Sequence, residues 1–159
     1  MTVQKAGRKQ IVTVRVANDG VIPVENFEIS MMIDDPNSGE FLDGYHIFEI
    51  LPDAYHDVSF TLTTLPVGVS NVYAVLDENN VVDEFNEDNN IGSIRIVNYA
   101  PCDYEPDGDV DVVDLATLAA EWLEIENLST DIYPIGGDGI VNFLDFAELA
   151  KYWLYIIEE

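Results

Sequence analysis

The first two thirds of the chain carry a hydrophobic pattern with a period of two. Between residues 10 and 98, apolar and polar side chains alternate in several short runs, among them 12–16, 27–33 and 58–62. This alternation is typical of β-strands that turn one face toward a core. Further runs, expected to complete a set of six or seven strands, lie at 41–51, 71–76 and 91–97.

Turn signals separate these runs. Glycine, proline, asparagine and aspartate cluster at 18–20, 35–39, 51–53 and 65–68, and these residue types punctuate strands because they favour turn conformations. Short alternating strands at this spacing predict an all-β sandwich of the immunoglobulin-like type. We assign residues 1–98 to this domain.

Residues 99–159 are expected to form a second domain, in which one pattern occurs twice at a spacing of 31 residues. Each copy has an acidic loop with Asp-Gly at its centre, followed by a helical run that ends in Trp-Leu. A period of this size indicates a duplicated unit. The run 112–123 is apolar on nearly every face. Antiparallel packing of the two helices would bury Leu115, Leu118 and Trp122 against their equivalents in the second copy, which are Phe146, Leu149 and Trp153.

The first loop has the ligand order of a calcium-binding EF-hand loop. Such a loop places oxygen side chains at positions 1, 3, 5, 9 and 12, glycine at position 6 and a carbonyl ligand at position 7. Glycine falls at Gly108. The predicted ligands are the side chains of Asp103, Glu105, Asp107, Asp111 and Asp114 and the carbonyl of Asp109.

The alternative is an acidic, solvated loop that caps a helix, because aspartate at a helix start is favourable without any metal. Six carboxylates within residues 103–114 would repel one another without a cation. We therefore favour calcium at this loop.

The second loop departs from this order by an insertion of three residues ahead of its Asp-Gly pair. Asp138, Asn142 and Asp145 keep positions 5, 9 and 12, and the Ile140 carbonyl keeps position 7. Asp131 is the candidate for position 1. The sequence therefore predicts two calcium ions, with the second more weakly held.

These two loop-helix units, with no helix ahead of either loop, resemble a dockerin domain over about the last 58 residues. Dockerins are calcium-dependent modules of secreted bacterial proteins that bind cohesin domains of a scaffold or cell surface. The resemblance implies cohesin contacts at loop positions 10 and 11, which are Val112 and Val113 in the first copy and Phe143 and Leu144 in the second. Lys151 on the second helix is a further candidate contact.

The first domain is similar to the bacterial cell-adhesion-related CARDB domain over about 95 residues. The similarity lies in residues 12–20 and in residues 76–90, where 84–90 match the Glu-x-Asn-Glu-x-Asn-Asn tail of that family. It implies a fold more than a function. Family members open with another alternating strand, but only nine residues precede the first run here. We therefore expect the first strand to be missing.

Composition narrows the classes of partner. Six basic against thirty-one acidic residues give a net charge of −25, which argues against nucleic acid and anionic membranes because both are recognised by cationic surfaces. No apolar run reaches the roughly 18 residues of a membrane span, and residues 1–10 lack the apolar core of a signal peptide. Cys102, the single cysteine, cannot form an internal disulfide.

The sequence thus predicts a non-catalytic, extracellular or cell-surface fragment of a longer secreted protein, in which a spacer or adhesion domain precedes a calcium-bound docking module. No serine lies in a nucleophile motif, and His46 and His56 have no partner at ligand spacing. One alternative is a carbohydrate-binding module, which would need Tyr45, Tyr55 and Tyr73 coplanar on an exposed sheet face. Another is a hydrolase with two acids in a cleft.

Overall fold

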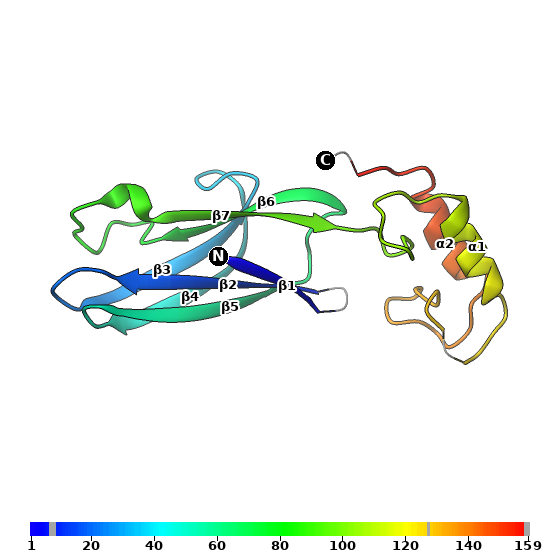
Figure 1. Cartoon of the computed structure of the whole chain (residues 1–159), viewed down its shortest axis with the longest axis horizontal. Coiled ribbons are helices and arrows are strands. Elements are labelled where there is room, and N and C mark those ends of the chain that lie inside the picture. The colour runs from blue at the N-terminus through cyan, green and yellow to red at the C-terminus, as the bar shows by residue number, and fades with distance from the viewer. Residues whose placement is uncertain (7–8, 127, 158–159) are drawn as a thin grey trace. The chain divides into compact units, whose positions relative to one another are not determined.

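The structure is a computed structural model that describes residues 1–6, 9–126 and 128–157 (Figure 1). The chain divides into two compact units. The first comprises Met1–Pro66 and Ser70–Ile96, and the second comprises Val67–Val69 and Val97–Glu159. Each unit is described separately below.

The first unit is a β-sandwich, as the alternating pattern predicted. Within the described residues, one sheet has three strands in the order β1-β2-β5 and the other has four in the order β4-β3-β6-β7. The strands are β1 (Thr2–Ala6), β2 (Lys9–Asn18), β3 (Val24–Ile33), β4 (Glu40–Ile50), β5 (Ala54–Leu62), β6 (Gly68–Leu76) and β7 (Ile91–Asn98).

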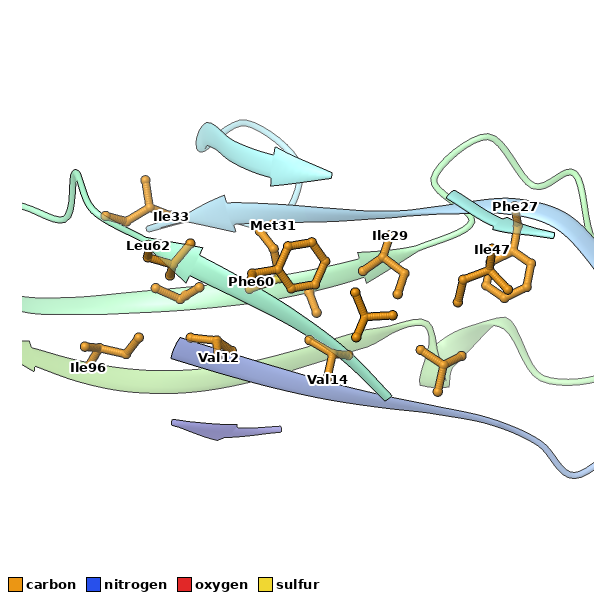
Figure 2. Close-up of a cluster of buried hydrophobic side chains, with 14 of the residues drawn as sticks. Val12, Val14, Phe27, Ile29, Met31, Ile33, Ile47, Phe60, Leu62 and Ile96 are labelled. Carbon is orange, nitrogen blue, oxygen red and sulfur yellow. The ribbon is translucent and has the colours of Figure 1, made fainter. Parts of the chain in front are cut away.

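The core of the sandwich lies between the two sheets. In the antiparallel β2–β5 pair, Val12 faces Phe60 and Val14 faces Val58, and all four side chains are buried. Figure 2 shows Val12, Val14 and Phe60 beside side chains of β3, among them the fully buried Ile29. The alternation in the sequence therefore marks which face of each strand enters the core.

A short first strand is present where the sequence predicted that it is missing. β1 pairs antiparallel with β2 in a register that places Val3 opposite Val12, so β2 has a hydrogen-bonded neighbour on both sides. The segment Thr2–Ala6 contains few apolar residues and has Gln4 and Lys5 side by side. Because such a segment shows no period of two, strand formation depends on pairing with β2 rather than on local pattern.

The second unit contains two helices, α1 (Val112–Ala120) and α2 (Phe143–Lys151). Each begins with a capping box, in which Asp111 and Asn142 respectively occupy the N-cap. The sequence predicted that the first helix continues to residue 123, but it ends at Ala120. The chain then reaches Leu123 in the left-handed conformation, with φ 66°, and a helix cannot continue through it.

The core of the second unit is smaller than the sequence predicted. Leu118 and Leu149, at equivalent points of the two helices, are buried together with Val110 and Val141. Phe146 and Trp153 of the second helical run, the expected partners of Leu115, Leu118 and Trp122, keep 39% and 42% of their surface exposed. An apolar groove therefore runs between the helices, lined by Leu115, Phe146, Leu149, Ala150 and Trp153. Neither helix has the length and apolar character that crossing a membrane requires.

Candidate metal centre

The two loops of the second unit are held in place by the same pair of backbone contacts. Leu123 N donates to Val141 O at 2.8 Å, and Leu154 N donates to Val110 O at 2.8 Å. The end of each helix thus bonds to the loop of the other repeat. The central glycines, Gly108 and Gly139, have φ of 98° and 95°, which a residue with a Cβ rarely adopts.

The carboxylate at loop position 12 is fully buried in both repeats. In the first loop, Asp114 Oδ1 accepts a hydrogen bond from Tyr104 N at 2.6 Å, and Asp114 Oδ2 accepts one from Asp111 N at 2.8 Å. The side chain therefore ties the start of the loop to the start of α1. Because Asp114 is shorter than a glutamate, the helix start lies close to the loop.

Asp103, at position 1 of the first loop, has an oxygen without a partner. Asp103 Oδ2 accepts a hydrogen bond from Gly108 N at 3.1 Å. Its other oxygen, Oδ1, is buried and has no hydrogen-bond partner. An unpartnered buried acceptor costs free energy, and a cation or a water bound at this oxygen would remove that cost.

Three further carboxylates of the first loop gather in one place. Glu105, Asp111 and Asp114 each offer an oxygen, and these oxygens all lie within 4.8 Å of one another. Burial, together with repulsion from Asp114 and Asp107, raises the pKa of Glu105. Burial raises the pKa of Asp103 as well, and the carboxylates of Asp114 and Asp107 add to this effect. The backbone N–H groups of Gly108 and Asp107 oppose it.

The first loop therefore fits a hard divalent cation. Its donors are all oxygens, as calcium prefers. A cation held by Glu105, Asp111 and Asp114 would supply the counter-charge that these acids lack. Asp107 is exposed and accepts a hydrogen bond from Asp109 N at 3.0 Å through Oδ1. The structure thus groups Glu105, Asp111 and Asp114, and neither Asp103 nor the exposed Asp107 is part of this group.

The acid at position 12 of the second loop makes the same kind of contacts as Asp114. Asp145 Oδ1 accepts from Ile132 N at 2.8 Å and Tyr133 N at 3.0 Å, and its Oδ2 accepts from Asn142 N at 2.9 Å. Among the described residues, which include the whole of this loop, its acids form no group of three with adjacent ligand oxygens. The two loops therefore share the hydrogen bonds of their position-12 acids to the N-cap backbone and differ in how closely their acids gather.

The predicted partner-contact residues lie beside the loops. Val112 and Val113 at the start of α1 are exposed, as are Phe143 and Leu144 at the start of α2. The Phe143 ring also packs edge-on against Trp122, with centroids 5.0 Å apart. Lys151 forms an ion pair with Glu148 and lies 5.5 Å above the Tyr133 ring.

Glu121, at the end of α1, is a structural anchor that sequence reasoning missed. Its carboxylate accepts four hydrogen bonds, from the backbone N–H and the hydroxyl of both Ser129 and Thr130. Although burial favours the neutral acid, these bonds lower the pKa of Glu121 below its usual value. No local pattern signals this role, because the partners lie eight and nine residues away.

Comparison with known proteins bears on the first unit. The sequence profile of the CARDB family matches residues 2–93. The chain belongs to the CARDB family. The match ends at residue 93, and the dockerin resemblance of residues 99–159 stays a prediction. No curated protein matches the chain at a significant level.

Two solved structures of one CARDB domain from Pyrococcus furiosus are similar to this chain. A crystal structure of that domain in complex with di-metal ions has 25% sequence identity and a TM-score of 0.50, over 56% of this chain and 72% of that chain. A solution NMR structure of the same domain has 25% identity and a TM-score of 0.49, over 56% and 78% of the two chains. The similarity to the crystal structure agrees with the β-sandwich described above.

The acidic bend of the CARDB unit, residues 77–90, is held by its own backbone. Asp77 is buried, and its Oδ1 and Oδ2 accept hydrogen bonds from Val81 N at 2.9 Å and Val82 N at 2.7 Å. Both carboxylate oxygens are thus engaged in closing the loop. This arrangement matches the local hydrogen bonding expected of asparagine and aspartate in a long strand connection.

The three tyrosines of the carbohydrate-binding alternative do not share a face. Tyr55 pairs with the exposed Ala17 on the outside of the three-stranded sheet, where Arg15 lies 4.0 Å above its ring. Tyr73 pairs with Met32 on the outside of the other sheet. Tyr45 stacks on His56 with centroids 6.0 Å apart. The coplanar platform that this alternative needs is therefore not formed by these residues.

Proposed function

We propose that the second unit is a calcium-dependent docking module of the dockerin type that attaches the chain to a cohesin domain. The CARDB unit then serves as a spacer or adhesion module outside the cell. The observation that carries the proposal is the buried, unpartnered Oδ1 of Asp103 in a loop that also gathers Glu105, Asp111 and Asp114. No catalytic role is assigned to any residue.

Calcium is the cation that this loop suits best. All candidate donors are carboxylate or carbonyl oxygens, with no thiol or imidazole among them, and calcium accepts six to eight oxygens in flexible geometry. Since the carboxylates repel one another without a cation, part of the binding free energy becomes folding free energy of the second unit.

Calcium and docking are linked through the start of α1. The N-cap residue Asp111 is a predicted ligand, and Val112 and Val113 follow it directly as exposed apolar side chains. A cation that fixes Asp111 also fixes the position of these two residues. Exposed apolar residues near a helix start are suited to a protein partner because their burial there is favourable.

We do not extend the metal ions of the Pyrococcus furiosus domain to this CARDB unit. Both Asp77 oxygens are already bonded to backbone N–H groups. Among the residues for which the structure gives side chains, the group of acids suited to a metal is the one in the second unit. The metal proposal therefore concerns the first loop of that unit.

A binding experiment with the whole chain tests the proposal. The chain is passed over a panel of immobilised cohesin domains in calcium and in chelator, and retention on at least one cohesin is expected in calcium only. Asp103→Ala should abolish retention, whereas Asp57→Ala, an exposed change on the CARDB unit, should leave it unchanged. Calcium binding without retention on any cohesin would reject the docking role and keep the metal site.

A further inference from the structure

The second loop is closed by hydrogen bonds within itself. Asp131 Oδ1 accepts from Asp138 N at 3.0 Å, and Asp131 Oδ2 accepts from Gly139 N at 2.8 Å. Both oxygens at position 1 are thus satisfied by backbone, whereas Asp103 has one oxygen without a partner. The acid at position 1 of the second loop therefore does not require a cation.

The inserted residues fill the space beside Asp131. Between Asp131 and Asp138 the chain contains no other acid, so position 3 has no carboxylate. A Cβ added at Gly137 would lie 2.4 Å from Asp131 Oδ2, which shows that the backbone of the insertion lies directly against the carboxylate. The loop is packed by its own turn where the first loop presents Glu105.

Asn142 donates to two oxygens that a calcium loop would offer to the ion. Its Oδ1 accepts from Leu144 N at 2.8 Å, which fixes the orientation of the amide. Its Nδ2 then donates to Ile140 O at 3.0 Å and lies 3.5 Å from Asp138 Oδ2. These oxygens belong to positions 7 and 5 of the loop.

The equivalent residue of the first loop cannot do the same. Asp111 also caps its helix through Oδ1, which accepts from Val113 N at 2.7 Å. Its other oxygen is an acceptor, since a carboxylate has no N–H to donate. The first loop therefore has no side-chain amide that could donate to its ligand oxygens, whereas the second loop contains one in Asn142.

From these contacts we infer that the chain binds one calcium ion, in the first loop, and that the amide of Asn142 takes the place of the cation in the second. The inference rests on the proposed function, which assigns calcium to this unit. The inference also says which part of the docking module calcium regulates. Calcium fixes the first loop and the start of α1, whereas the second loop and the start of α2 form without calcium.

Calcium stoichiometry of the whole chain, measured by calorimetry and native mass spectrometry, tests this inference. We expect one ion for the natural sequence, none for Asp103→Ala and two for Asn142→Asp, which replaces the amide donor with an acceptor. Two ions in the natural sequence would overturn the inference while keeping the proposed function. No ion in the natural sequence would overturn both.

Two further outcomes keep the roles of the loops distinct. One ion retained in Asp103→Ala would place calcium in the second loop and overturn the inference, and one ion in a folded Asn142→Asp would overturn the role of Asn142. If Asn142→Asp does not fold, the amide resonances of the natural sequence decide. Calcium should shift the Gly108 resonance and leave that of Gly139 in place, and a comparable shift at Gly139 would contradict the inference.

Discussion

Replacing the buried acid at position 12 of each loop separates the contribution of calcium from that of hydrogen bonding. Asp114→Asn and Asp145→Asn keep the shape of side chains that are both fully buried. The assay is tryptophan fluorescence during urea unfolding, in calcium and in chelator. The two tryptophans of the chain, Trp122 and Trp153, both lie in the second unit, so fluorescence reports the stability of that unit.

In chelator, both substitutions should destabilise the unit through lost hydrogen bonds. Asparagine replaces one acceptor oxygen by an amide that cannot accept, and a buried N–H left without a partner costs about 1–3 kcal/mol. Asp114 also stands among Glu105 and Asp111, and losing its charge relieves repulsion there. We therefore expect a smaller loss for Asp114→Asn than for Asp145→Asn when no calcium is present.

In calcium the order should reverse. At a free calcium concentration of 100 times the dissociation constant, one bound ion stabilises the folded unit by about 2.7 kcal/mol. Asp114→Asn should lack most of this gain, and Asp145→Asn should keep all of it. A calcium gain lost equally in both variants would show that both loops bind, and no gain in the natural sequence would refute the calcium assignment.

Three further outcomes follow from the second unit. Leu149→Ala should lower the unfolding free energy by about 2–5 kcal/mol in the same fluorescence assay, because this fully buried leucine would leave a cavity. The folded-state pKa of Glu121 is lowered, so ionised Glu121 stabilises the fold above its unfolded pKa of about 4.3. This stabilisation is lost as pH falls through the folded pKa. Unfolding titrations from about pH 6 to 3 should therefore show a shallower loss of unfolding free energy for Glu121→Gln than for the natural sequence. Phe143→Ala should weaken cohesin binding more than Val112→Ala in surface plasmon resonance, because the larger side chain buries more apolar area at about 25 cal/mol per Å², and equal small losses would indicate two interchangeable docking orientations.

The sandwich was predictable because its strands show which face is buried. The alternation at 12–16 and 58–62 corresponds to inward side chains of β2 and β5. Strand ends were less predictable, since β6 begins at Gly68 rather than at residue 71. Backbone pairing extends a strand past its last apolar residue, and β1 is the extreme case, with no alternation of its own.

The duplication was also predictable, but its packing was not. An even repeat suggests that equivalent side chains have equivalent environments. Trp122 packs against Phe143, whereas the residue equivalent to Phe143 in the first repeat is Val112, which offers no ring. Trp153 is accordingly 42% exposed. Equivalent tryptophans of the two repeats thus have different neighbours.

The two loops show why a ligand pattern alone does not count ions. Asparagine and aspartate are equivalent at position 9 when the loop is read as a list of oxygen ligands. In the folded loop, the N-cap hydrogen bond occupies one side-chain oxygen in both repeats. Asp111 Oδ1 accepts from Val113 N in the first, and Asn142 Oδ1 accepts from Leu144 N in the second. What remains is an acceptor on Asp111 and a donor on Asn142, and only the acceptor calls for a cation. The chemistry of the site is thus decided by the atom left over after capping, which depends on the N-terminal turn of the helix as much as on the loop.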